Sequence, residues 1–136
     1  MIIGKKIGDI FTTDDKHVIF ALNTEGVNDC GFADQVAIRG FEEILSTGGN
    51  KLGEVLDKEI NGITYHGIVC YSRHNGWEGS PEIILKAINN MKFDGKASIL
   101  PICCSGFIAI VKKAPVSDIF KAFEDSNKEL TIWSMY

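Results

Sequence analysis

Two segments of this sequence have the composition of loops that bind anions through their backbone. The first follows an apolar run at residues 18–23 and contains Gly31, Phe32 and Ala33. The second follows Pro101 and holds small residues up to Gly106. A strand that leads through a small-residue loop into a helix leaves backbone N–H groups pointing outward, where they can bind an anion. Two such loops facing each other predict a small-molecule ligand that carries phosphate.

The adjacent Cys103 and Cys104 raise the question of a thiol nucleophile. A cysteine at a helix N-terminus is activated and can attack an electrophile. His66 is the candidate base, but it falls within a predicted strand, and nothing in the sequence brings it to Cys104. The cysteines form no Cys-x-x-Cys pair. We therefore interpret them as free, buried thiols and expect no metal site.

A polar loop at residues 73–77 precedes a predicted helix. Arg73 is suited to binding a phosphate in a bidentate manner, and Trp77 lies in the same loop, so we hypothesise that the loop closes over the ligand as a lid. A solvated loop explains the same residues equally well. Asp34 near a predicted helix start is explained by the helix dipole, and Trp133 by packing.

Composition and charge argue against several classes of protein. The chain has 136 residues, of which 45% are hydrophobic and 24% are charged, which predicts one globular domain over residues 1–136. The net charge of −4 argues against general nucleic-acid binding. No apolar run approaches the roughly 20 residues of a membrane-spanning helix, and residues 1–6 lack a signal-peptide pattern. We therefore expect a cytoplasmic protein with no membrane partner.

The elements that position these residues follow from periodicity and turn signals. Asn61-Gly62 between two apolar runs predicts a β-hairpin with a type I′ turn. Ser80-Pro81 predicts a helix start, because serine caps well and proline suits the first helical position. Apolar residues at helical spacing predict a helix over 33–45, with Gly40 inside it, and a last helix from Pro115. Strands are predicted at residues 2–7, 18–23, 56–60, 63–70, 97–103 and 130–133.

The order of these elements predicts the fold class. Strands alternate with helices, and a single hairpin interrupts the alternation, which predicts an α/β protein with a three-layer α/β/α sandwich and a mixed central sheet. Ligands of open α/β sheets bind beyond the carboxyl ends of the strands. Those ends are predicted at residues 23–33 and 103–107, where the two anion-binding loops lie.

Five motifs along the chain together resemble a known family. They are Gly8-Asp9-Ile10-Phe11, Phe20-Ala21-Leu22-Asn23, Gly31-Phe32-Ala33, Pro101-Ile102-Cys103-Cys104-Ser105-Gly106 and Glu129-Leu130-Thr131-Ile132-Trp133. In this order and at this spacing they resemble the macro domain, an ADP-ribose-binding fold. The chain is most similar to the branch that contains terminal ADP-ribose protein glycohydrolase and related small phage and bacterial proteins.

The resemblance implies a role for each motif. Asp9 would accept a hydrogen bond from the adenine amine, the N–H of Ile10 would donate to a ring nitrogen, and Asn23 would contact the distal ribose. Two sets of backbone N–H groups would each hold one of the two phosphates. The first set is Gly31, Phe32 and Ala33, and the second is Cys104, Ser105, Gly106 and Phe107. The Phe107 ring, or a nearby aromatic ring, would pack on a ribose or base. Two local alternatives stay open, since Asp9 can merely cap a turn and Asn23 can bond to its own loop.

The chain departs from the branch where catalysis is concerned. The branch has a lysine nucleophile where this chain has Cys70-Tyr71-Ser72, and an aspartate where it has Phe107-Ile108-Ala109. The resemblance therefore implies binding of ADP-ribose, an ADP-ribosylated macromolecule or a related NAD-derived nucleotide, as a reader or sequestering module without lysine–aspartate catalysis and without a cofactor. One alternative is an ADP-ribosyl hydrolase or ADP-ribose phosphomonoesterase that positions a water. Another is a structural subunit that has lost the pocket.

Overall fold

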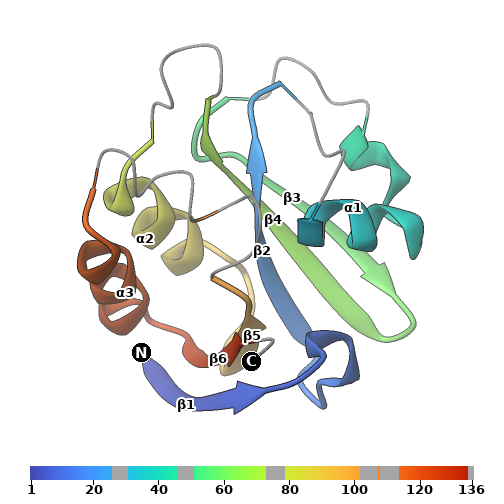
Figure 1. The fold of residues 1–136 in the computed structure, drawn as a ribbon, viewed down its shortest axis with the longest axis horizontal. Helices are drawn as coiled ribbons and strands as arrows, with labels where there is room; N and C mark the ends of the chain where they lie inside the picture. Colours follow the sequence, from blue (N-terminus) through green and yellow to red (C-terminus); the bar gives the residue numbers. More distant parts are fainter. Residues whose placement is uncertain (26–30, 46–50, 73–78, 102–106, 108–113, 135–136) are drawn as a thin grey trace.

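The strands of this protein form a mixed sheet. The computed structural model describes residues 1–25, 31–45, 51–72, 79–101, 107 and 114–134. Within these residues, six strands pair in the order β1-β6-β5-β2-β4-β3 (Figure 1). The strands are β1 (Ile2–Ile7), β2 (His17–Asn23), β3 (Val55–Ile60), β4 (Ile63–Tyr71), β5 (Lys96–Ile99) and β6 (Glu129–Ser134). All neighbours are parallel except β3, which pairs antiparallel with β4. The predicted α/β class and mixed sheet are confirmed.

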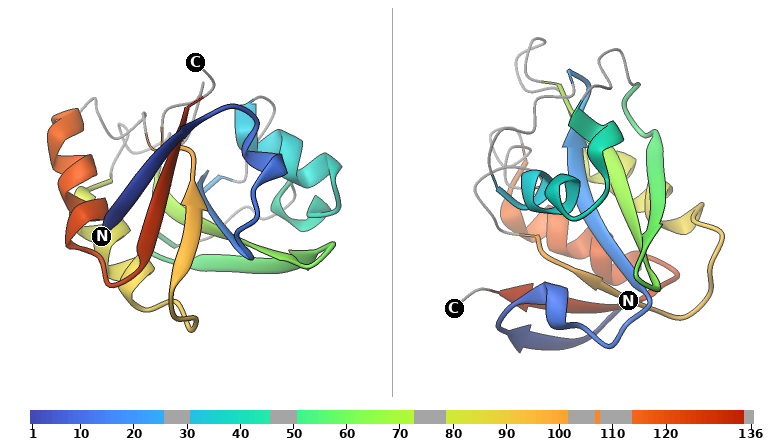
Figure 2. Two further views of the ribbon diagram at one scale, coloured as in Figure 1. Left: turned by 90° about the horizontal axis from the view of Figure 1, so that it is seen from below. Right: turned by 90° about the vertical axis from the view of Figure 1, so that its right-hand side faces the viewer.

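Helices cover both faces of this sheet. Helices α2 (Pro81–Asn89) and α3 (Val116–Asp125) lie on one face and α1 (Gly31–Ile38) on the other (Figure 2). Ile19 of β2 packs with α2 and α3, whereas its neighbour Phe20 packs with α1, as the period of two in a strand requires. Within the described residues no helix has the length and apolar character needed to cross a membrane.

Local signals set the turns and helix starts as expected. Asn61 and Gly62, between β3 and β4, both have positive φ, at 51° and 84°, as a type I′ turn requires. Ser80 caps α2, since its side chain accepts a hydrogen bond from the N–H of Ile83, and Pro81 is the first residue of the helix. Both predictions are confirmed.

Two element boundaries differ from the prediction. The helix expected over 33–45 ends at Ile38, because Gly40 has a φ of 135°, which no α-helical residue adopts. A short 3-10 helix, η2 (Glu42–Leu45), follows. The strand expected over 97–103 pairs only from Lys96 to Ile99, and Pro101 has no N–H to extend the ladder. Residues 102 and 103 lie outside the described residues.

The Trp133 side chain confirms the packing interpretation. It is 5% exposed, and its indole N–H donates to the hydroxyl oxygen of Ser98 at 3.0 Å. Ser98 in turn donates to Asp15 at 2.8 Å. These bonds tie β5, β6 and the segment that precedes β2 together.

Candidate functional site

Two parallel strands end side by side at the edge of the sheet where the sequence predicts a ligand. β2 ends at Asn23 and β4 ends at Tyr71, and these two residues are partners in the strand register. The N–H of Thr24 donates to the carbonyl of Tyr71 at 3.1 Å, so the pairing continues beyond β2. Ser72, the next residue along, is buried. Polar residues of both strands therefore meet at this carboxyl edge.

Asn23 is buried and engaged in local hydrogen bonds. Its side-chain oxygen accepts from the N–H of Glu25 at 3.1 Å, and its amide nitrogen donates to the hydroxyl of Tyr71 at 3.4 Å. The bond to Glu25 is the loop interaction that the sequence left open as an alternative. Contact between Asn23 and a ribose stays a prediction.

Glu25 is a polar residue of this edge that the sequence analysis missed. Its carboxylate accepts hydrogen bonds from the hydroxyl of Thr24 and from the hydroxyl of Ser72 at 2.9 Å. A carboxylate only accepts hydrogen bonds, so in this place it suits a ribose hydroxyl or a water molecule. The available signal was an acidic residue two positions after a predicted strand end.

Asp9 lies at the start of the short 3-10 helix η1 (Ile10–Thr12) and caps it. Its Oδ1 atom accepts from the N–H of Phe11 at 3.0 Å, so the capping role that the sequence left open is present. Among the described residues none donates to the second carboxylate oxygen. The side chain of Ile10 is buried in the core, which holds this short helix against the sheet. A contact between Asp9 or Ile10 and adenine stays a prediction.

Aromatic stacking joins this segment to the start of α1. The rings of Phe11 and Phe32 stack with centroids 5.0 Å apart, and Phe32 and Ala33 are buried against β2. Gly31, Phe32 and Ala33 form the first turn of α1, where backbone N–H groups have no partner within the helix. Two of the four segments expected to contact the ligand are therefore adjacent in space.

Arg39 adds a positive charge next to the same segment. Its guanidinium carbon lies 3.7 Å from the centre of the Phe11 ring, which is a cation–π contact, and it donates to the side chain of Gln35 at 3.1 Å. The charge of Arg39 also acts on Tyr65, which is buried: burial raises the pKa of Tyr65, and the charge of Arg39 opposes this shift. The sequence analysis did not single out Arg39, because a lone arginine near a helix end has no distinctive spacing.

Several solved macrodomain structures have the same arrangement of strands and helices. A macrodomain protein from Streptomyces coelicolor aligns with a TM-score of 0.68 at 14% identity, covering 98% of this chain and 99% of that one. The DarG macrodomains of Mycobacterium tuberculosis and Thermus aquaticus give TM-scores of 0.64 and 0.63, at 14% and 13% identity. These alignments cover 98% of this chain and 97% and 98% of theirs. This chain has the macrodomain fold.

The sequence alone leads to no such match. No protein-family model and no curated protein matches it. The structure nevertheless confirms the macrodomain fold that the five motifs imply. A fold can be shared without sequence similarity, because the sheet order and the helices on both faces are set by burial patterns that many sequences satisfy.

Several residues expected in the macrodomain ligand site lie outside the described residues. They are Cys104, Ser105 and Gly106 of the second loop, and Arg73 and Trp77 of the lid. Their roles stay predictions. Phe107 is described, and its ring is 1% exposed and packs edge-on against Phe123 at 5.5 Å. The Phe107 ring thus packs in the core beneath α3. Packing of a nearby aromatic ring on a ribose or base, and a role for the Phe107 backbone N–H, stay predictions.

Thiol chemistry finds no support among the described residues. Cys70 is buried and donates weakly to the carbonyl of Leu22 at 3.8 Å, as expected of a packed thiol. His66 contacts Asp57 and His17, and Cys104 is not described. Among the described residues no group of histidine, cysteine and acidic side chains is arranged to hold a metal ion.

Proposed function

We propose that this macrodomain binds ADP-ribose or a related NAD-derived nucleotide, free or attached to a macromolecule, without lysine–aspartate catalysis. The stacking of Phe11 on Phe32 at 5.0 Å is the observation that most supports the proposal. It sets the Asp9 segment beside the first turn of α1, so a carboxylate suited to a purine amine and N–H groups suited to a phosphate would serve one ligand.

The chemistry of each group fits this assignment. One oxygen of Asp9 caps η1, which fixes the carboxylate and leaves its second oxygen to accept from an adenine amine. The N–H groups at the start of α1 and the charge of Arg39 favour a phosphate. The absence of lysine at residues 70–72 is the reason for proposing binding without the lysine nucleophile.

Calorimetric titration with ADP-ribose tests the proposal, and Asp9→Asn is the informative variant. Asparagine keeps an oxygen for the cap, but it places an NH2 group where the second carboxylate oxygen was. Two donors then face each other at the adenine amine. We expect wild-type protein to bind ADP-ribose and the variant to bind about tenfold to a hundredfold more weakly, the cost of a charged hydrogen bond.

Asp14→Asn is the matched control, because Asp14 is an exposed aspartate of the same segment. It should bind as the wild type does. A thermal unfolding midpoint of Asp9→Asn close to that of the control would show that the cap is intact. Absence of heat with wild-type protein, at concentrations that reveal micromolar affinity, would refute the proposal and favour a structural subunit.

The geometry of Glu25 favours hydrolysis of an ADP-ribosyl bond as a second candidate function. Its carboxylate is fixed by Ser72 at 2.9 Å and lies beside Asn23. A fixed carboxylate can orient a water for attack and accept its proton, so a protein nucleophile is not required. Hydrolysis of a phosphomonoester of ADP-ribose would use the same water.

Release of ADP-ribose from ADP-ribosylated protein or DNA measures this activity. We expect Glu25→Gln to lower the rate at least about a hundredfold, the usual contribution of a general base, while ADP-ribose still binds. Asn23→Ala should abolish release. Equal rates for Glu25→Gln and wild type would remove Glu25 from the mechanism, and no release by wild type would leave only the binding function.

A further inference from the structure

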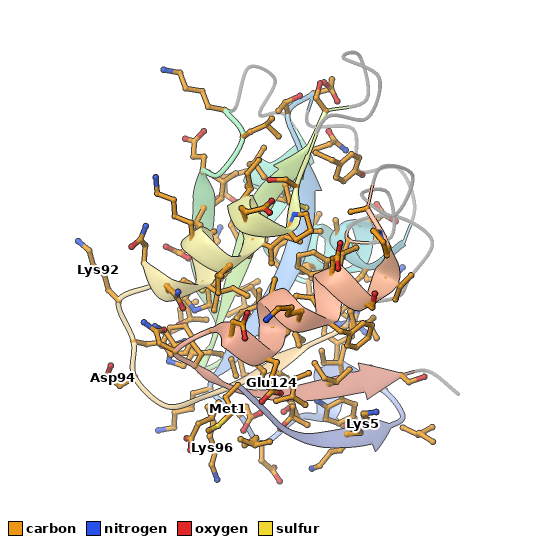
Figure 3. The ribbon with its side chains drawn as sticks, turned by 90° about the vertical axis from the view of Figure 1, so that its left-hand side faces the viewer. Met1, Lys5, Lys92, Asp94, Lys96 and Glu124 are labelled. Atoms are coloured by element: carbon orange, nitrogen blue, oxygen red, sulfur yellow. The ribbon has the colours of Figure 1, made fainter. Side chains whose placement is uncertain are left out.

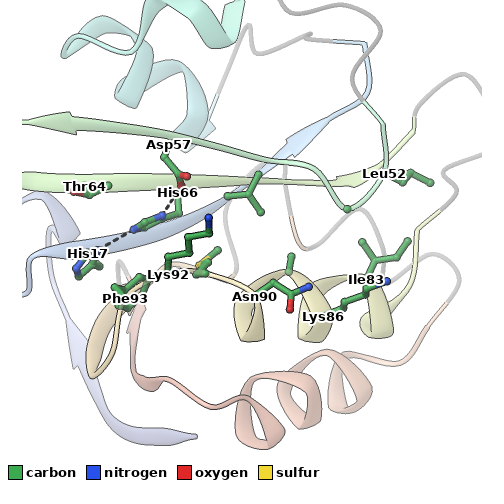
Figure 4. Close-up of a pocket in the computed structure, with 14 residues that line it drawn as sticks. His17, Leu52, Asp57, Thr64, His66, Ile83, Lys86, Asn90, Lys92 and Phe93 are labelled. Atoms are coloured by element: carbon green, nitrogen blue, oxygen red, sulfur yellow. Dashed lines mark hydrogen bonds and ion pairs between the residues drawn. The ribbon is translucent and has the colours of Figure 1, made fainter.

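A pocket lies on the α2 face of the sheet and runs along it from His17 to Gly53. Its volume is about 790 Å³, and it lies between the β3–β4 hairpin and α2 (Figure 4). This volume is in the range of small-molecule sites, roughly 300–1,000 Å³. His17, the first residue of β2, lines it, whereas Asn23 at the carboxyl edge is the last residue of that strand. Gly53 at the other end donates its N–H to the carbonyl of Val69 in β4, and none of the described residues proposed to bind the nucleotide lines the pocket.

A chain of hydrogen bonds runs along one end of this pocket. Asp57 of β3 contacts the Nδ1 atom of His66 at 2.5 Å. The Nε2 atom of His66 contacts the Nδ1 atom of His17 at 2.9 Å. The ring of Phe93 stacks on His17 with centroids 3.8 Å apart and planes within 5°, so the outer imidazole is fixed in position.

The hydrogen bonds indicate where the protons lie when both imidazoles are neutral. The carboxylate of Asp57 only accepts, so Nδ1 of His66 donates to it and Nε2 of His66 is an acceptor. Nδ1 of His17 must then donate to His66, which leaves Nε2 of His17 as an acceptor. Burial lowers the pKa of both histidines, in agreement with this neutral arrangement. Among the described residues none donates to Nε2 of His17.

Positive charge and apolar surface line the rest of the pocket. Lys86 and Lys92 line it and are exposed, and Figure 4 shows Lys92 beside the imidazole pair and Lys86 near Ile83 at the other end. Asp57 is the acidic residue among the lining side chains, and its charge is already directed to His66. The apolar lining residues are Leu52, Val55, Ile83, Met91 and Phe93.

We propose that this pocket binds a small organic anion with an apolar body. The charges of Lys86 and Lys92, at the two ends of the pocket, favour an anion over a neutral ligand, and the apolar residues contact its body. The anionic group is a phosphate or a carboxylate, since both are anions that bind a lysine ammonium group. The proposal does not depend on nucleotide binding at the carboxyl edge.

Titration of the full chain with three small probes, followed by NMR of the histidine rings, tests this inference. The probes are phenyl phosphate, benzoate and the neutral benzyl alcohol. We expect a saturable shift of the His17 and His66 signals with phenyl phosphate, benzoate or both, and weaker binding of benzyl alcohol. A response to only one of the two anions identifies the head group. The signal that is missing from the spectrum of His17→Gln is assigned to His17.

The double variant Lys86→Gln/Lys92→Gln tests the charge. Both lysines are exposed, so the variant should fold, and we expect about tenfold weaker binding of the anion, as two exposed ion pairs provide. Lys5→Gln is the matched control, since Lys5 is on β1 and lies on the far side of the molecule from Lys92 (Figure 3). The proposal is overturned if neither anion gives a saturable shift, if benzyl alcohol binds as well, or if the double variant binds as the wild type does.

Discussion

Gly67 of β4 has no room for a side chain on the α1 face of the sheet. A Cβ atom at this position would lie 2.5 Å from Cδ1 of Leu22 and 2.9 Å from Cζ of Phe20. Both neighbours belong to β2 and are almost fully buried, so they cannot turn away without displacing other core side chains. The glycine thus sets how closely β2 and the α1 layer pack at this point.

We expect Gly67→Ala to lower the free energy of unfolding by about 1–3 kcal/mol, the usual cost of overpacking. Urea unfolding measures it. Gly4→Ala is the matched control, because no atom lies within 4 Å of a Cβ there, and its effect should stay within about 1 kcal/mol. Equal losses for the two variants would show that the close contact at Gly67 is not the cause.

At the scale of the element, Gly40 determines where α1 ends. The sequence pattern alone predicts a helix through this position, and alanine would then be about 1 kcal/mol better than glycine. In the structure Gly40 has a φ of 135°, where an L-residue is strained. We expect Gly40→Ala to lower the free energy of unfolding by about 1–2 kcal/mol. Urea unfolding measures this change, and its sign distinguishes a helix that continues through Gly40 from one that ends before it. A gain in stability would contradict the observed end of α1.

Elements with local signals were predictable from the sequence, and those set by distant contacts were not. Asn61-Gly62 and Ser80-Pro81 carry their turn and cap in adjacent residues, and the structure confirms both. The early end of α1 depends on the backbone conformation of Gly40, which packs near Ile60 of β3. A glycine in the sequence allows this conformation but does not predict it, since glycine is also tolerated inside helices.

At the scale of the whole molecule, His17 and His66 determine how stability depends on pH. Burial lowers the pKa of His17 and His66 below the usual 6.5, against the opposing charge of Asp57. The unfolded chain then binds more protons than the folded one below pH 6.5, so stability falls as pH falls through that range. Burial also lowers the pKa of the Met1 amino group below its usual value of 8.0, which changes stability with pH in the same direction.

We therefore expect the urea midpoint to be highest at pH 7.5 to 8 and to fall towards pH 5.5. His17→Gln removes one titrating group and should reduce the difference in midpoint between pH 7.5 and pH 5.5. A midpoint that rises on acidification, or a variant with the full wild-type dependence, would contradict the assignment to the histidine pair.

The two candidate sites were not equally predictable. Asp9 and Asn23 stand out because each lies at a loop or strand end with a recognisable motif. His17 and His66 are 49 residues apart, and they meet only because β2 and β4 pair in a register that puts His66 opposite Ile19. No local pattern contains that register, so the pocket beside α2 could not be inferred from the chain alone.

The length of β2 has a consequence for the two proposed ligands. The strand has seven residues, which span about 20 Å at the usual rise, with Asn23 at one extremity and the His17–His66 pair at the other. Groups so far apart and without shared partners contribute additively. A nucleotide and an aromatic anion would accordingly occupy the protein without competition, and the increments in melting temperature that each confers alone would sum when both are present.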